Sequence, residues 1–170
     1  LAGLDARAMK LLLDGTVAHV YRDSAVFSSA AKDGPESPYW PWFRAERIAR
    51  HRATRPPGWI THDAPLDPVG ALAALPPGEP ALVDCLTLWL TNLMLADRDI
   101  AAETRRLAEM LARPSRPLVL VANEVGLGIV PDNALARRFR DAQGQLNQKI
   151  AASADRVVFL AAGLPLTLKP

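Results

Sequence analysis

A chain of 170 residues, 49% of them hydrophobic and with a formal net charge of +2, is the right size for one domain, residues 1–170, around a single core. Its apolar stretches fall short of the ~18 residues that a membrane-spanning helix requires, and a pI near 9.0 is weak evidence for nucleic-acid binding, so we expect neither a membrane span nor a nucleic-acid partner. The single cysteine, Cys85, excludes an internal disulfide, which favours a cytoplasmic protein.

The first 45 residues form an atypical segment. Residues 1–13 are predicted to form a helix and residues 17–27 one or two strands. Residues 33–42 contain three prolines, one glycine and two tryptophans, a composition that predicts a loop. This segment is therefore considered apart from residues 46–170.

Beyond this segment, apolar runs alternate with helical periodicity. Three runs without polar alternation are predicted as strands: residues 81–83, 117–122 and 157–161. Two helices are predicted between the first two runs: residues 87–96 and 100–112. This order predicts an α/β fold with a mostly parallel sheet flanked by helices, and the apolar strands indicate that helices cover both faces.

A third helix is predicted to begin near Asp132. Its apolar stripe recurs at spacings of three and four residues and consists of Leu135, Phe139, Ala142, Leu146 and Ile150. Arg137, Arg138 and Arg140 form a basic cluster on the same helix. This cluster is open to two interpretations, a solvated helix face or a site for subunit or substrate contacts.

A single histidine lies within a short basic segment. His51 is accompanied by five arginines: Arg44, Arg47, Arg50, Arg52 and Arg55. Neighbouring positive charge disfavours imidazolium, so the ring is kept neutral and nucleophilic, while the guanidinium groups can hold the phosphates of a nucleotide. An exposed histidine on a basic helix is the alternative interpretation of the same residues.

Asp84 directly follows a predicted buried strand. A parallel strand would deliver this carboxylate to the carboxyl edge of the sheet, where it can hold Mg²⁺ at a nucleotide triphosphate. Because Asp84 also precedes a helical stretch, it is equally suited to be a helix N-cap. The residues alone leave both roles open.

Polar residues also follow the next predicted strand. Asn123 and Glu124 stand at its end, and Gly126 and Gly128 lie in the loop beyond. Glycines allow the backbone to approach a ligand closely, but a lone Gly-x-Gly pattern also describes an ordinary turn. Asn123 and Glu124 are therefore further candidate site residues.

Taken together, these segments resemble a known family, the bifunctional adenosylcobinamide kinase / adenosylcobinamide-phosphate guanylyltransferases of cobalamin biosynthesis. The resemblance runs in register over residues 46–170. The segments that carry it are residues 47–59, 84–87, 91–93, 123–126, 129–131, 136–137, 139–141 and 147–148. Such a match over most of the chain is more specific than any single motif within it.

The resemblance implies two reactions, phosphorylation of adenosylcobinamide and transfer of GMP from GTP to the resulting phosphate through a guanylyl-histidine intermediate. His51 matches the family's histidine. The residues that match its nucleotide-binding positions are Arg52, Ala53, Thr54, Arg55, Asp63 and Asp84. Asp84 also matches the metal-binding acid, and Asp63 follows an expected strand that contains Trp59.

The resemblance further implies a P-loop NTPase-like (RecA-like) sheet, GTP, ATP and Mg²⁺ as cofactors, a corrinoid substrate and a homotrimer. One family feature is missing from the sequence, because no glycine-rich loop ending in Gly-Lys-Ser or Gly-Lys-Thr is present. The alternative function is therefore a catalytically impaired, truncated or frame-damaged family member that retains only oligomerisation or corrinoid binding.

Overall fold

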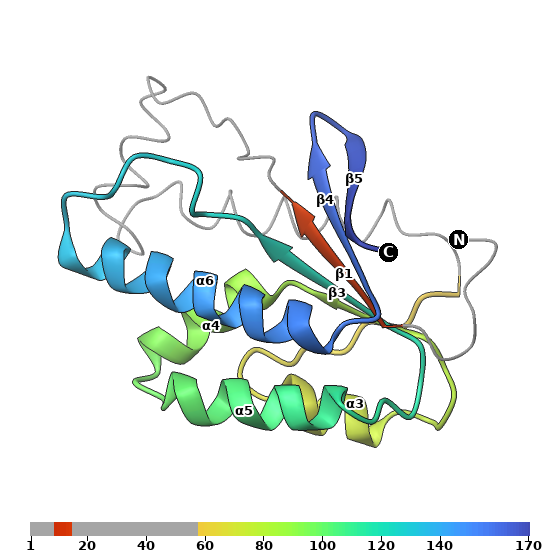
Figure 1. Cartoon of the computed structure of the whole chain (residues 1–170). Helices are drawn as coiled ribbons and strands as arrows, with labels where there is room; N and C mark the ends of the chain where they lie inside the picture. The colour runs from red at the N-terminus through yellow and green to blue at the C-terminus, as the bar shows by residue number, and fades with distance from the viewer. Residues whose placement is uncertain (1–8, 15–57) are drawn as a thin grey trace. The chain divides into compact units, whose positions relative to one another are not determined.

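In the computed structural model, residues 9–14 and 58–170 are described. The chain divides into two compact units, one made of residues 1–16 and 63–170 and the other of residues 17–62. The strands of the first unit are β1 (Met9–Asp14), β2 (Ala81–Asp84), β3 (Leu118–Asn123), β4 (Arg156–Ala161) and β5 (Leu164–Lys169). Its helices are α3 (Pro68–Ala74), α4 (Leu86–Leu95), α5 (Ile100–Leu111) and α6 (Ala134–Ser153) (Figure 1).

The five strands form one sheet in the order β2-β3-β1-β4-β5. β1 to β4 run parallel to their neighbours, and β5 pairs antiparallel with β4. The prediction of a mixed α/β fold with a mostly parallel sheet is therefore confirmed. The carboxyl ends of β1, β2, β3 and β4 meet at one edge of this sheet, which we call the carboxyl edge.

Residues 9–13 lie in a central strand, so the prediction of a helix over residues 1–13 is wrong there. β1 pairs with β3 on one side and with β4 on the other, and Asp14 lies opposite Asn123. A short apolar run has no periodicity that separates strand from helix, and its two neighbours in the sheet decide the outcome. The predictions for residues 17–27 and 33–42 lie outside the described residues.

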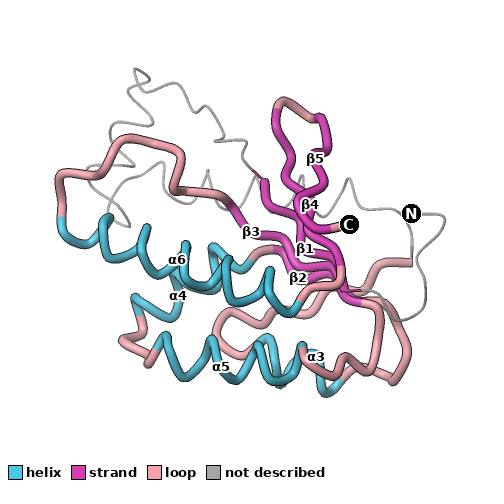
Figure 2. Tube along the Cα trace, viewed as in Figure 1, coloured by secondary structure: helices cyan, strands magenta, loops and turns pink. Residues whose placement is uncertain are grey.

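The described helices cover one face of the sheet (Figures 1 and 2). The connections from β2 to β3 and from β3 to β4 advance in the same direction along the strand order, so right-handed crossovers place their helices on the same side. Along β3 the burial alternates, with Leu118, Leu120 and Ala122 buried and the residues between them half-buried. Helices were predicted on both faces of the sheet, and the described part of the chain supplies the helices of one face.

The core lies between this face and the helices. Its fully buried side chains include Leu86, Leu90 and Leu93 of α4, Leu107 and Leu111 of α5, Leu118 and Leu120 of β3, and Leu146 and Ile150 of α6. The apolar stripe predicted for α6 is thus confirmed at its C-terminal end, whereas Leu135 at its start is 65% exposed. Helices α4 and α5 begin and end within one residue of their predicted bounds.

Two elements were not predicted. α3 begins with an Asp67 N-cap, whose Oδ1 accepts a hydrogen bond from Gly70 N at 2.8 Å, and has Pro68 at its first position. This backbone bond, followed by the hydrogen bond from Arg106, holds the pKa of Asp67 below its usual value. β5 follows a two-residue turn in which Ala162 (φ 52°) and Gly163 (φ 77°) both adopt positive φ, as type I′ hairpins require.

Candidate functional site

Two polar strand ends lie side by side at the carboxyl edge. β2 ends at Asp84, which a cis peptide bond joins to Cys85, and the neighbouring strand β3 ends at Asn123. Asn123 N donates to Thr87 Oγ1 at 2.8 Å, and the Cys85 thiol lies 3.9 Å from Asn123 Oδ1. The end of β3 is therefore tied to the first turn of α4, directly beside Asp84.

Asp84 is the last residue of its strand and is exposed. The N-cap of α4 is Cys85, which makes no side-chain capping bond, so the alternative interpretation of Asp84 as an N-cap is wrong. A helix that starts only at Leu86 leaves Asp84 within the strand. Its carboxylate is thereby presented at the edge where parallel α/β proteins bind ligands.

Glu124 closes the turn that follows β3. Its Oε1 accepts a hydrogen bond from Gly126 N at 2.7 Å, and a Cβ placed on Gly126 would lie only 2.7 Å from the same oxygen. The lack of a side chain at Gly126 therefore makes room for Glu124 of the same turn, while Gly128 faces open space. The ordinary-turn interpretation of this glycine pair accounts for the contacts of Gly126.

A buried pair of side-chain amides on α6 is hydrogen-bonded to the backbone at the end of β3. Gln143 is fully buried, Asn147 is 5% exposed, and Gln143 Nε2 donates to Asn147 Oδ1 at 2.8 Å. Asn147 Nδ2 in turn donates to Asn123 O at 3.2 Å. Sequence analysis missed both as core residues, although their spacing of four, in step with Phe139, places them on the buried face of the helix.

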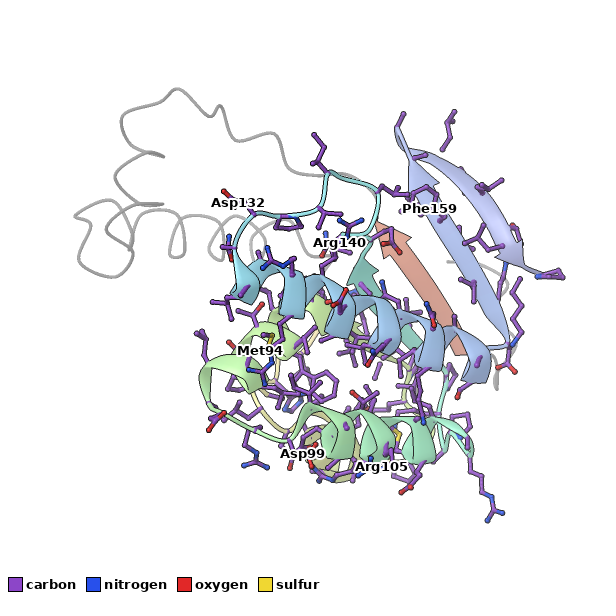
Figure 3. The ribbon with its side chains drawn as sticks, turned by 60° about the vertical axis from the view of Figure 1, so that its left-hand side comes forward. Met94, Asp99, Arg105, Asp132, Arg140 and Phe159 are labelled. Carbon is purple, nitrogen blue, oxygen red and sulfur yellow. The ribbon has the colours of Figure 1, made fainter. Side chains whose placement is uncertain are left out.

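The two candidate arginines of α6 bind backbone carbonyls of the loop that follows β3. Arg140 Nη2 donates to Gly126 O at 2.6 Å (Figure 3), and Arg137 Nη1 donates to Pro131 O at 3.0 Å and to Asp132 O at 2.6 Å. Neither is simply a solvated charge on a helix face. They hold the start and the end of the loop onto α6.

Asp63 lies in an irregular segment before α3 and is exposed. The expected strand around Trp59 is absent, because residues 58–67 contain neither helix nor strand. The segment after Asp63 is bound to α4 instead, through Trp89 Nε1 to Leu66 O at 3.2 Å and Asn92 Nδ2 to Pro65 O at 3.0 Å. These bonds fix this segment to the helix that starts beside Asp84.

The remaining predicted site residues are His51, Arg52, Ala53, Thr54 and Arg55, and they lie outside the described residues. Among residues 58–170, no three acidic, histidine or cysteine side chains gather closely enough to form a metal cage. Mg²⁺ at nucleotide sites is commonly held by one or two carboxylates together with the phosphates. A single exposed carboxylate at a strand end, as Asp84 offers, fits that mode of binding.

One hollow in the described part of the chain lies at the opposite, amino edge of the sheet. It has a volume of about 340 Å³ and is lined by Leu111, Ala112, Pro114, Ser115, Arg116, Ser153 and Asp155. The guanidinium of Arg116 is already bonded to Leu75 O and Pro76 O, and α5 and α6 end here with their carbonyl groups. A helix C-terminus disfavours anions, so this hollow is a poor place for a phosphate.

None of the helices in the described ranges is long and apolar enough to cross a membrane. A mostly parallel sheet with an acidic and an amide strand end adjacent at its carboxyl edge defines an α/β protein of the class that binds ligands at that edge.

Sequence comparison identifies the family within that class. The family described as cobinamide kinase / cobinamide phosphate guanyltransferase matches residues 43–168, and the chain belongs to this family. It is 47% identical over 126 residues to the bifunctional adenosylcobalamin biosynthesis protein CobP of Pseudomonas aeruginosa, covering 72% of this chain and 73% of that protein. It is 37% identical over 142 residues to the CobU proteins of Salmonella typhimurium and Escherichia coli, covering 74% of this chain and 78% of each.

The resemblance found in the sequence is thus confirmed, and with it the enzyme class of kinases and nucleotidyltransferases of cobalamin biosynthesis. The matched region begins three residues before the predicted boundary at residue 46.

Proposed function

We propose that this chain phosphorylates adenosylcobinamide and then transfers GMP from GTP to the new phosphate, with His51 as the nucleophile. The observation that carries the proposal is the family match over residues 43–168, which includes His51 and the candidate acids Asp63 and Asp84. The proposal draws further support from the exposed carboxylate of Asp84 at the carboxyl edge of a parallel sheet.

Guanylyl transfer proceeds in two displacements. A nitrogen of the neutral His51 ring attacks the α-phosphorus of GTP, a P–N bond forms, and pyrophosphate leaves with the electrons of the broken P–O bond. An oxygen of the corrinoid phosphate then attacks the same phosphorus and releases the histidine. Five arginines near His51 in the sequence favour its neutral, nucleophilic form and supply bidentate donors for the phosphates.

The other candidate residues bind the nucleotide in this proposal. Arg52, Ala53, Thr54 and Arg55 follow the nucleophile and contact GTP, and Asp63 and Asp84 complete the nucleotide site. Asp84 would hold Mg²⁺, which when bound neutralises charge on the phosphates. ATP or GTP donates the phosphoryl group in the kinase step. Asn123 and Glu124 shape the edge beside Asp84.

The proposal includes the fold subtype and the assembly of the family. The sheet would be of the P-loop NTPase (RecA-like) type, with β1 as the strand that precedes the phosphate-binding segment. The active protein would be a cytoplasmic homotrimer. Light scattering in solution tests the assembly, and a monomeric mass at micromolar concentration would contradict it.

Labelling with GTP carrying ³²P at the α-phosphate tests the nucleophile. With Mg²⁺ present, wild-type protein should acquire acid-labile, alkali-stable label, as expected of a phosphoramidate. His51→Ala should remove this label, whereas the matched control His62→Ala, which alters an exposed histidine nearby in the sequence, should label like wild type. Equal labelling of His51→Ala would eliminate His51 as the nucleophile.

One sequence feature favours a second candidate function. The 170 residues contain no Gly-Lys-Ser or Gly-Lys-Thr, the end of the loop whose amides and lysine cradle phosphates in P-loop enzymes. A member without this loop would retain corrinoid binding or subunit association but not catalysis. Calorimetry separates the two candidates, because this second form binds adenosylcobinamide and shows no affinity for GTP or ATP at millimolar concentration.

A further inference from the structure

Asn123, the last residue of β3, is hydrogen-bonded through both its backbone and its side chain. Its backbone N–H donates to Thr87 Oγ1 at 2.8 Å, and its backbone carbonyl accepts a hydrogen bond from Asn147 Nδ2 at 3.2 Å. Its side-chain oxygen, Oδ1, faces the thiol of Cys85 at 3.9 Å, and a thiol is a weak donor. Three of the four polar groups of Asn123 are therefore engaged within the protein.

The fourth polar group, the side-chain amide nitrogen Nδ2, makes no hydrogen bond to any residue that the structure describes. Within residues 58–170 the buried side-chain nitrogen and oxygen atoms without a partner are Arg140 Nη1 and Gln143 Oε1, so Nδ2 is open to solvent. The amide group is planar, and contact of Oδ1 with the Cys85 thiol turns Nδ2 to the opposite side. Asn123 thus presents an N–H donor in a fixed orientation.

This donor shares one face of the sheet with Asp84. Asp84 pairs with Val121 across β2 and β3, and Asn123 lies two positions beyond Val121 on the same strand. Because side chains alternate along a strand, Asp84 and Asn123 belong to the same face. A strand separation of about 4.8 Å and a rise of about 3.3 Å per residue place their Cα atoms roughly 8 Å apart. Side chains at this separation can contact different oxygens of one phosphorylated ligand.

The charges at this edge favour a neutral donor for an anionic ligand. Asp84 is exposed, and Glu124 directly follows Asn123, so carboxylates flank the amide. An ionised carboxylate accepts hydrogen bonds and cannot donate one to a phosphate. Both oxygens of Asn123 already accept hydrogen bonds from the protein. Asn123 therefore offers a ligand its N–H group rather than an oxygen for a metal ion.

We propose that Asn123 Nδ2 donates a hydrogen bond to a phosphate oxygen of the ligand at the carboxyl edge, and that Asn123 does not bind the metal ion. The inference rests on the proposed function, which brings phosphorylated ligands to this edge, and it assigns a contact that the proposed function leaves open. Thr87, Asn147 and Cys85 are positioning residues in this arrangement, because they fix the backbone of Asn123 and the orientation of its amide.

Two substitutions of Asn123 distinguish a hydrogen-bond donor from a metal ligand. Asn123→Ala removes the amide, and Asn123→Asp replaces Nδ2 by an oxygen while keeping Oδ1 and both backbone bonds. Calorimetry of the full chain with Mg²⁺ present measures the affinity for GTP and, separately, for adenosylcobinamide phosphate, which shows whose phosphate is contacted. Asn123→Ala should weaken binding of at least one of these ligands about tenfold or more, because hydrogen bonds to charged groups are strong. Asn123→Asp should weaken binding of the same ligand further, through charge repulsion.

Asn133→Asp is the matched control. It makes the same change from amide to carboxylate at the N-cap of α6, where Asn133 Oδ1 accepts a hydrogen bond from Ala136 N at 2.7 Å. Aspartate caps a helix about as well as asparagine does, so this variant should bind both ligands like wild type. Urea unfolding of each variant checks that it is folded, and Asn123→Ala alone decides the test if Asn123→Asp does not fold.

Unchanged affinity of Asn123→Ala for both ligands would overturn the inference. So would an Asn123→Asp protein that binds either ligand more tightly than wild type, because a carboxylate in place of an amide strengthens a metal ligand. An equal loss in Asn133→Asp would show that added negative charge, rather than a lost donor, weakens binding. Failure of the wild-type protein to bind either ligand would refute the proposed function and this inference together, whereas the other contrary results leave the proposed function standing.

Discussion

The buried amide pair on α6 offers the sharpest quantitative test of the candidate site. Asn147→Leu keeps the branching and the number of heavy atoms of the side chain but removes its acceptor and its donor. Gln143 Nε2 then loses its acceptor at 2.8 Å, and Asn123 O loses its donor at 3.2 Å. Leaving a buried polar group unpaired costs about 1–3 kcal/mol, so the two orphaned groups together predict a loss of about 2–6 kcal/mol.

Gln143→Leu should cost less than Asn147→Leu. It orphans only Asn147 Oδ1, leaves the bond from Asn147 to Asn123 O intact, and removes Gln143 Oε1, a buried acceptor without a partner in the described part of the chain. In the double variant the orphaned donor and its acceptor disappear together. Its loss should therefore be smaller than the sum of the two single losses by about 1–3 kcal/mol.

Urea unfolding of the wild type, both single variants and the double variant gives this coupling energy from the transition midpoints, provided that the m-values agree. The m-value is the internal control, because a change in it would mean that a variant altered more than the pair. Additivity within about 0.5 kcal/mol would refute the reasoning. So would a greater loss for Gln143→Leu than for Asn147→Leu.

Two other predictions concern stability. Asp67→Ala should lower the free energy of unfolding by about 1 kcal/mol at neutral pH, because it removes the cap of α3. The folded-state pKa of Asp67 lies below its usual 3.8, so the stability that its carboxylate contributes is complete above pH 3.8 and is lost as the pH falls through the lowered pKa. The free energies of unfolding of wild type and Asp67→Ala should therefore converge in acid. A difference that stays constant with pH would contradict this. Arg116→Met should cost about 2 kcal/mol or more in urea unfolding, because the Leu75 and Pro76 carbonyls lose a buried charged donor that is 6% exposed; a change below about 0.5 kcal/mol would contradict it.

The middle of the fold was predictable because its signals are local. Each of β2, β3 and β4 is a short apolar run, and α4 and α5 carry their own boundaries, such as the Asp99 N-cap of α5. Where a signal depends on distant partners, prediction failed. β1 has the composition of either a strand or a helix, and only pairing with β3 and β4 settles its state.

Part of the candidate site was predictable for the same reason. A polar residue that ends a parallel strand must lie at the carboxyl edge, so Asp84 and Asn123 were placed correctly from the order of elements. The partners of Arg137 and Arg140 are backbone carbonyls, which every residue possesses, so no residue pattern reveals them. Gln143 and Asn147 could have been found, because they are polar residues at positions that face the core. Such positions predict either an unpaired buried group or a buried hydrogen-bond network.

The place of β1 in the sheet bears directly on how a chain without a Gly-Lys-Ser loop would hold a nucleotide. β1 is central, and its last residue, Asp14, lies opposite Asn123 at the carboxyl edge, where the neighbour of β3, strand β2, ends at Asp84. In P-loop proteins the segment that follows the corresponding strand supplies backbone amides and a lysine to the phosphates.

Here the sequence after Asp14 offers Gly15 and Thr16 without a neighbouring lysine, and positive charge is concentrated instead in the five arginines around His51 in the sequence. Arginine binds phosphate oxygens in a bidentate manner, so in the proposed function these arginines would supply positive charge to the phosphates but not the backbone amides of a P-loop. Labelling of His51 by GTP would therefore mean that the nucleotide is held for attack at the α-phosphorus without a Gly-Lys-Ser loop.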